Sequence, residues 1–461
     1  MHGHHVIRCG WSQGSVNLKT RCGISRLNFR PCLGTFFAVK VFLQMVVVTA
    51  LCLASCARTP EPRAAGPLRH EAYVWQRDWN PRVQAAVGEG VTRLDGLTLL
   101  AAEVSWRGGR PEVLHIPLPY ATLTNSAVPI GFALRIGAFH GPFRADDATA
   151  TLLCNLAVGI LEEARAAGMK PVELQLDFDC AESTLDGYCL WLEAVKRRIA
   201  PIPVSITALP SWLDRPAFRR LARCAGSYVL QVHSLHRPSN AKEPFTLCDP
   251  REAREAVERA ASFGVPFRVA LPTYGYRLDF TSDGQLADIA ADGTDDGNPS
   301  SLSSREIRTD PVAMAGLVRA WMRDRPTLMS GLLWYRLPVA GDRRNWSWPT
   351  LTRVVKGQSP RGHLRVEPRY PQPGLVEWDL LNDGDADAST RFDLSVKWDN
   401  GILMAGDGLH GFELAGRASI SCELRSPEEA DFLPPGERRT IGWLRLSTNT
   451  EVRGELFHRL P

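Results

Sequence analysis

Two aspartates separated by one residue end a short apolar run, in the stretch Gln175-Leu-Asp177-Phe-Asp179. Because side chains alternate between the two faces of a strand, we expect Gln175, Asp177 and Asp179 to share one side. Two buried carboxylates without counter-charges are costly unless they are paired or functional. Neighbouring carboxylates also move each other's pKa values apart, which leaves one protonated as a general acid and the other ionised, the combination that glycoside hydrolysis needs.

The sequence leaves a structural role for this pair open. One aspartate can pair with an arginine such as Arg135 or Arg77, and the other can cap the following helix. The functional interpretation is favoured because both acids fall at the carboxyl end of a predicted strand. In that interpretation Asp179 is the general acid, and Asp177 is the carboxylate that orients it or tunes its pKa.

Most of the other predicted strands also end in an aromatic or hydrogen-bonding side chain. Glu103 and His233 are the candidates for a second catalytic group, although a histidine at a strand end can equally be structural. The candidates for substrate contact, whose aromatic members can instead pack under loops, are Trp75, Arg77, Arg135, Gln175, Gln231, Tyr274, Tyr276, Trp334 and Arg336.

The elements that must position these residues alternate between short apolar runs and longer amphipathic segments. This pattern predicts repeated β/α units around a parallel sheet, and eight runs are the number that a TIM (β/α)8-type barrel needs. In such a barrel, polar groups at the carboxyl ends of the strands line one mouth. The predicted strands are residues 71–76, 96–104, 130–136, 172–178, 204–208, 228–233, 267–272 and 328–335, with helices such as 147–167 and 250–263 between them.

Two further segments differ from this pattern. Residues 281–309 are rich in Asp, Gly and Ser and lack the spacing of a calcium-binding EF-hand, so we interpret them as a solvated or lid-like loop. After Gly362 the chain turns to short alternating strands, at 374–381, 391–398 and 440–446, which predicts a small all-β immunoglobulin-like sandwich that packs on the barrel or contacts a partner.

The N-terminal region has the pattern of an export signal. Residues 39–54 form a short basic start and an apolar run, and Leu53-Ala-Ser-Cys56 matches the bacterial lipobox, in which the cysteine is lipidated. We therefore expect translation from Val39 and a protein anchored through a lipid on Cys56 to a bacterial membrane, facing the periplasm or the cell surface. The predicted organisation is a leader at 1–55, a tether at 56–69, a barrel at 70–358 and a sandwich at 362–461.

Composition and charge narrow the class of protein. The 461 residues are 44% hydrophobic and 23% charged, as in ordinary soluble proteins. The formal net charge is +4, but residues 1–55 hold six basic residues and no acid, so the remainder carries 48 basic against 50 acidic residues, a net charge of −2. This balance argues against nucleic acid as a partner.

The chain lacks the sequence signatures of the common cofactor and metal enzymes. There is no GxGxxG, Walker A, HExxH or GxSxG pattern, so we predict neither a cofactor nor a catalytic metal. After the leader cysteines and Cys56 are set aside, six cysteines remain, and none forms a CxxC or zinc-like spacing. Their state, as disulfides or as buried free thiols, stays open.

The segments Tyr73-Val-Trp-Gln-Arg77, 175–180, 185–192, 205–212, 230–233 and 273–276 resemble a bacterial family, domain of unknown function 3142. More distantly, the strand-four acids and Leu271-Pro-Thr-Tyr-Gly275 look like the chitinase-type barrels, family eighteen of the glycoside hydrolases. Those enzymes carry DxxDxDxE, whereas the run here ends in Asp179 and lacks the first acids. The resemblance implies a carbohydrate ligand, although another small polar ligand stays open. Two functions remain open, namely glycoside hydrolysis, or a non-catalytic lipoprotein that binds an envelope polysaccharide or acts as a scaffold for other proteins.

Overall fold

The computed structural model describes residues 62–291, 303–427 and 431–457. The predicted leader and the lipobox lie outside these ranges. In the part of the chain that is described, no helix has both the length and the apolar character needed to cross a bilayer.

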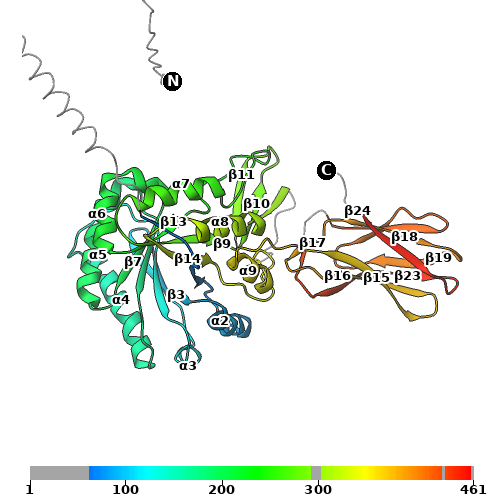
Figure 1. The fold of residues 1–461 in the computed structure, drawn as a ribbon, viewed down its shortest axis with the longest axis horizontal. Helices are drawn as coiled ribbons and strands as arrows, with labels where there is room; N and C mark the ends of the chain where they lie inside the picture. The colour runs from blue at the N-terminus through cyan, green and yellow to red at the C-terminus, as the bar shows by residue number, and fades with distance from the viewer. Residues whose placement is uncertain (1–61, 292–302, 428–430, 458–461) are drawn as a thin grey trace, which may run out of the picture. The chain divides into compact units, whose positions relative to one another are not determined.

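Eight parallel strands form a closed barrel, which confirms the predicted barrel (Figure 1). Closure is complete because the first strand pairs in parallel with both the second and the last. In the order of the sequence the strands are β2 (Arg69–Val74), β3 (Gly96–Arg107), β5 (Ile130–Ile136), β6 (Leu174–Phe178), β7 (Val204–Ala208), β8 (Tyr228–Gln231), β9 (Phe267–Pro272) and β14 (Met329–Tyr335).

Helices follow most of the strands and start where the sequence supplies a cap. The side chain of Asp147 accepts a hydrogen bond from Ala150 N at 2.8 Å, and Asn80, Asp249 and Asp310 cap their helices in the same way. The helices are α2 (Pro81–Arg93), α4 (Ala148–Ala166), α5 (Leu185–Ile199), α6 (Pro216–Ala225), α7 (Pro250–Ala261), α8 (Pro311–Arg323) and α9 (Trp348–Val355).

The connection from β3 to β5 departs from the repeated β/α pattern. It contains β4 (Arg110–His115), which pairs antiparallel with β3, and the four-residue α3 (Tyr120–Leu123) in place of a long helix. Residues 108–128 hold two adjacent glycines and three prolines, which disfavour a continuous helix.

Alternate side chains of the strands fill the barrel interior in layers. At the amino-terminal end of the strands, Arg268 donates to Glu71 at 2.6 Å and to both carboxylate oxygens of Glu173 at 2.7 Å. The layer above contains Tyr73, Val229, Ala270 and Leu333, together with the buried polar side chain of Gln175. The polar ends of the strands lie above that, at the carboxyl-terminal mouth.

The predicted loop at 281–309 is instead partly a sheet. Strands β10 (Gly275–Phe280), β11 (Leu286–Ala290) and β12 (Ser303–Arg308) pair antiparallel, while residues 292–302 lie outside the described ranges. Pairing with β10 satisfies the backbone groups of both polar strands, an interaction that composition alone does not reveal. One of the aspartates in this segment, Asp288, lies on β11 opposite Asp279 on β10.

The C-terminal part of the chain consists of antiparallel strands around one hydrophobic core, which includes Trp378, Trp398 and Leu424. An immunoglobulin-like topology remains a prediction. One four-stranded sheet has the order β15 (Leu364–Gln372), β16 (Leu375–Asn382), β23 (Arg438–Leu446), β19 (Leu403–Gly408), and the other has β20 (Glu413–Ala415), β21 (Ser421–Arg425), β18 (Asp393–Trp398), β24 (Val452–Phe457). Short strands β17 (Ala388–Ser389) and β22 (Phe432–Leu433) pair beside them, and β1 (Arg63–Ala64) pairs with β13 (Arg325–Pro326) near the barrel.

The charge cluster at the base of the barrel gives a stability prediction. Replacing Arg268 with Met leaves Glu173 without its counter-charge inside the lumen and leaves Glu71 with the more distant, exposed Arg69, so the free energy of unfolding should fall by about 3–5 kcal/mol. Urea denaturation at neutral pH measures this change. The control is Arg69→Met, since Arg69 is exposed and lies 3.5 Å from Glu71, and it should cost about 1 kcal/mol or less. Equal losses in the two variants would contradict the role given to Arg268.

Candidate active site

A cavity of about 250 Å³ opens at the carboxyl-terminal ends of the barrel strands. Eight of the residues expected at the mouth line it, and they come from several different strands. They are Trp75, Arg135, Asp177, Asp179, Gln231, His233, Tyr274 and Tyr276.

The two aspartates at the end of β6 lie together in this cavity. Asp177 accepts a hydrogen bond from the Thr207 hydroxyl at 2.7 Å. Burial, followed by the nearby charge of Asp179, raises the pKa of Asp177 to about 6. Partial removal of water by the surrounding protein also raises the pKa of Asp179, and the positive charge of Arg135 opposes this rise. The Asp179 side chain is still exposed at the mouth. The pair therefore holds a proton at a higher pH than ordinary aspartates do.

Neither aspartate is neutralised in the way that the structural alternative requires. Among the described residues, no arginine lies within ion-pair distance of Asp177 or Asp179. Arg77 donates instead to Glu103, at 2.7 and 2.8 Å. The short helix at Glu182–Thr184 and α5 after it also receive no side-chain cap, so Asp179 does not serve them.

Aromatic residues form the wall beside the carboxylates. His233 is buried, and this burial lowers its pKa to about 3, so its ring is neutral near pH 7. The ring stacks on Tyr335 with centroids 5.6 Å apart. The hydroxyls of Tyr274 and Tyr276 are 3.0 Å apart, and the latter is 2.6 Å from the Ser234 hydroxyl. A neutral imidazole with so low a pKa is a poor proton acceptor, but it can hydrogen-bond a ligand.

Five of the expected site residues do not line the cavity. Glu103 and Arg77 pair with each other near the ends of their strands, and Arg336 donates to Asp342 at 2.7 Å. Gln175 is buried in the lumen below Asp177, and Trp334 is buried on the outer face of β14, where its Nε1 donates to His70 Nδ1 at 3.2 Å.

The position of Trp334 follows from the alternation of side chains along β14. Successive side chains point to opposite faces, so Leu333 and Tyr335 face the lumen and Trp334 faces the helices. Tyr335 is therefore the cavity residue that the sequence analysis missed by one position. Tyr73, Ser234 and Arg237 also line the cavity without having been predicted. Parity could have identified Tyr73, which lies two residues before Trp75, but no sequence signal marks the loop residues Ser234 and Arg237.

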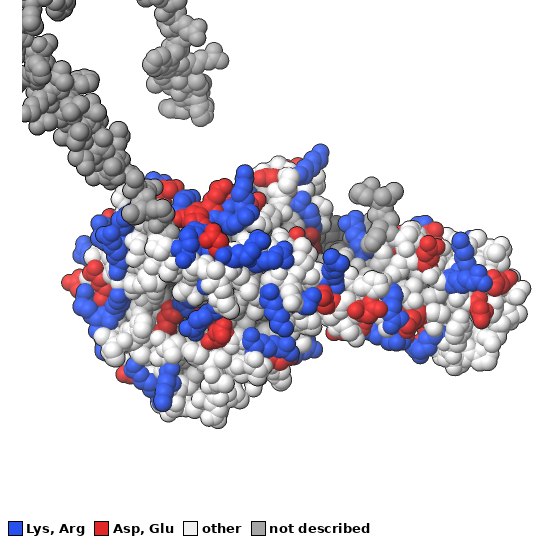
Figure 2. All heavy atoms as spheres, in the orientation of Figure 1, with Lys and Arg blue, Asp and Glu red and all other residues white. Residues whose placement is uncertain are grey.

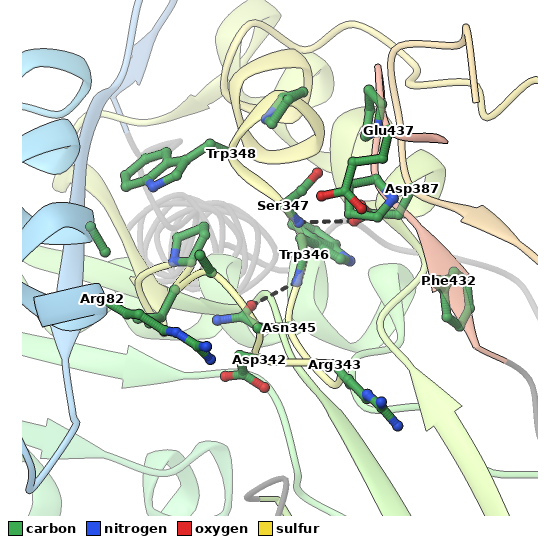
Figure 3. Close-up of a pocket in the computed structure, with 18 of the residues that line it drawn as sticks. Arg82, Asp342, Arg343, Asn345, Trp346, Ser347, Trp348, Asp387, Phe432 and Glu437 are labelled. Atoms are coloured by element: carbon green, nitrogen blue, oxygen red, sulfur yellow. Dashed lines mark hydrogen bonds between the residues drawn. The ribbon is translucent and has the colours of Figure 1, made fainter. Parts of the chain in front are cut away.

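A second and larger cavity, of about 890 Å³, shares no lining residue with the first (Figure 3). It is lined by α2, the loop before α9 and residues 431–439. Its acids mostly have partners, since Asp387 accepts from Ser347 N at 2.9 Å and Asp342 accepts from Arg336. We place the candidate active site at the smaller cavity, because only that one contains a carboxylate pair with raised pKa values.

The visible surface of the described chain carries mixed charge. Figure 2 shows basic and acidic side chains intermingled over this face, with no broad area of one sign.

A family described as Domain of unknown function (DUF3142) matches part of this chain. Residues 141–340 match its family model. This match confirms the first resemblance seen in the sequence, and it contains the strand ends that carry both aspartates, His233, Tyr274 and Tyr276. No curated protein matches the sequence.

Solved structures similar to this chain include chitinases. The spore cortex-lytic enzyme SleL of Bacillus cereus is 15% identical, with a TM-score of 0.44 over 64% of this chain and 75% of that one. A chitinase of Chromobacterium violaceum is 15% identical, with a TM-score of 0.44 over 63% and 98%. The family-eighteen chitinase ChiB of Flavobacterium johnsoniae is 12% identical, with a TM-score of 0.41 over 64% and 94%. The barrel assignment rests on the strand pairing rather than on these low scores.

The raised pKa of Asp177 predicts how stability depends on pH. The folded protein binds more protons than the unfolded chain between the ordinary pKa of 3.8 and about 6, so stability falls as pH rises through this window. Asp177→Asn keeps an acceptor for Thr207 and removes the buried charge. At pH 7 the variant should be more stable by about 3 kcal/mol, which corresponds to a rise in pKa from 3.8 to about 6, and at pH 3 the two proteins should be equal. Urea denaturation at both pH values measures the difference.

Asp214→Asn is the control for this experiment, because Asp214 is exposed and pairs with Arg259 on the surface. It should show no gain in stability at pH 7. An Asp177→Asn variant that is less stable than the parent at pH 7 would contradict the account, since it would mean that the Asp177 charge is compensated in the folded protein.

Proposed function

We propose that the barrel hydrolyses a glycosidic bond in a carbohydrate, with Asp179 as the general acid. The observation that supports this most is the pair Asp177 and Asp179, in an open cavity at the mouth of the barrel, with raised pKa values and with no ion-paired arginine among the described residues. A purely structural pair at this position would be expected to carry a counter-charge, as the glutamates at the other end of the lumen do.

The two aspartates have different tasks in this proposal. Asp179 is exposed at the mouth, where a substrate can reach it, and it donates its proton to the leaving glycosidic oxygen. Asp177 is fixed by Thr207 and shares the proton of the pair, so it tunes the pKa of Asp179. Once that proton has passed through Asp179 to the leaving group, the negative charge of the pair stabilises the positive charge that develops on the sugar ring. Water then forms a bond to the anomeric carbon as the bond to the leaving oxygen breaks, and it gives a proton to the Asp179 carboxylate, which restores the acid. Glu103 is not assigned a catalytic role because its carboxylate pairs with Arg77. His233 is not assigned one because its pKa is too low for it to accept a proton.

The remaining cavity residues suit a ligand with many hydroxyls. Trp75, Tyr276 and Tyr335 are each partly exposed and offer ring faces or edges against which a sugar ring can pack. Gln231, Arg135 and Arg237 add hydrogen-bond donors around the same cavity. The alternative function, a barrel that binds an envelope polysaccharide without cleaving it, uses these same side chains but does not need the aspartates.

The discriminating experiment compares the parent protein with Asp179→Asn on a panel of bacterial and plant polysaccharides. We expect the parent to release products and the variant to lose at least about 100-fold in rate, because the amide cannot supply a proton. Asp214→Asn is the matched control and should keep full activity. Equal binding by parent and variant without any products would favour the non-catalytic alternative and refute hydrolysis.

We also propose that the protein is exported and anchored by a lipid on Cys56. The proposal includes a tether at 56–69, a barrel at 70–358 and an immunoglobulin-like sandwich at 362–461, so that the barrel mouth faces the periplasm or the cell surface. Support comes from the lipobox Leu53-Ala-Ser-Cys56 directly after an apolar run. In that position the barrel would meet the carbohydrates of the cell envelope.

Metabolic labelling with a fatty acid tests the anchor. The parent should incorporate the label and sediment with membranes, whereas Cys56→Ser should do neither. Cys52→Ser lies in the same leader and should leave labelling unchanged. A Cys56→Ser variant that is still labelled would refute this part of the proposal.

A further inference from the structure

Two cysteines and a glutamate meet on the outer side of the barrel, away from the mouth. Cys189 and Glu193 are four residues apart on α5, which places them on one face of the helix. Cys224 lies near the end of α6, the neighbouring helix, and is 35 residues further along the chain than Cys189. This separation explains why no motif marks the cluster in the sequence.

The distances within the cluster match those of a set of metal ligands. Glu193 Oε1 lies 3.9 Å from Cys189 Sγ and 3.8 Å from Cys224 Sγ, and one potential ligand atom from each residue lies within 4.8 Å of the others. In a tetrahedral zinc site, with bonds of about 2.3 Å to sulfur and about 2.1 Å to oxygen, neighbouring sulfur and oxygen ligands are about 3.6 Å apart. The two sulfur-to-oxygen distances are therefore within a few tenths of an ångström of those in such a site.

The geometry points to a binding site for a soft divalent cation such as Zn²⁺, held by Cys189 Sγ, Cys224 Sγ and the Glu193 carboxylate. Two thiolates select zinc over calcium or magnesium, which prefer oxygen ligands. Glu193 is exposed and Cys224 is half-buried, so the cation can enter from solvent, and water fills the fourth position.

The charges around the site fit this assignment. Two thiolates and a carboxylate carry three negative charges, which leaves one in excess when a divalent cation is bound. Lys196 donates to the Ala225 carbonyl oxygen at 3.1 Å, which places a positive charge beside the cluster without pairing with Glu193. Within the described part of the chain, the Glu193 carboxylate has no ion-pair partner, so it is available to the metal.

A competition titration of the reduced full-length chain with Zn²⁺ and a chromophoric chelator tests the proposal. Loss of even an outer-shell partner weakens metal affinity about 10–100-fold, so Cys224→Ser should weaken zinc binding about tenfold or more. Glu193→Gln should do the same with little risk to folding, because Glu193 is an exposed helix residue. Cys154→Ser is the matched control, since Cys154 is a half-buried cysteine on α4 outside the cluster, and it should bind as the parent does.

Two further readouts make the outcome decisive. Co²⁺ bound by the parent should show thiolate-to-cobalt charge-transfer absorption that Cys224→Ser weakens and Cys154→Ser does not. Zn²⁺ should raise the melting temperature of the parent but not that of Glu193→Gln. The proposal is overturned if the cluster variants bind Zn²⁺ as tightly as the parent. It is equally overturned if Cys189 and Cys224 are isolated as a disulfide that resists reduction in the folded protein, because the thiolates would then not exist.

Discussion

Closure of eight parallel strands drives every second side chain into one narrow lumen, and the rest of the structure depends on how this lumen is filled. A charge in that space is stable only if it is compensated or if solvent reaches it. At the base, Arg268 compensates Glu71 and Glu173. A buried layer that includes Tyr73 and Leu333 lies between this cluster and the mouth, so the acids at the two ends of the lumen have different surroundings.

This difference in surroundings explains why the aspartates at the mouth have raised pKa values. Arg77, a possible partner for the aspartates, pairs with Glu103 instead. Arg135 on the neighbouring strand lowers the pKa of both aspartates, but by less than burial raises it. The donor that Asp177 does have is neutral, the hydroxyl of Thr207. The resulting shared proton is what an acid catalyst needs at mildly acidic pH, and it is obtained at some cost in the stability of the folded chain.

Much of the barrel follows from the sequence because strands buried on both faces read as continuous apolar runs. In such a run, however, the sequence does not show which alternate side chains face the lumen and which face the helices. The sequence therefore predicts Trp334 at the mouth, whereas the structure places Tyr335 there. Asp177 and Asp179 are predictable from the sequence because a charged side chain in an otherwise apolar strand is costly unless it lies at a polar site.

Features that depend on long-range pairing were not predictable in this way. The insert after β9 is polar in composition, and only its pairing across β10 makes it a sheet. Cys189 and Cys224 come together because α5 and α6 pack side by side, which no local pattern encodes. Arg237 lies on an irregular loop, where neither periodicity nor parity applies.

The most direct test of the central claim is a carbon-13 NMR titration of the aspartate carboxyl groups, with Asp177→Asn and Asp179→Asn used to assign the two signals. The account predicts that the Asp177 signal titrates near pH 6 and that the Asp179 signal also titrates above the ordinary aspartate range. If both signals titrated below the ordinary value of 3.8, the pair would be fully ionised at mildly acidic pH, and the claim that it holds a catalytic proton would be contradicted.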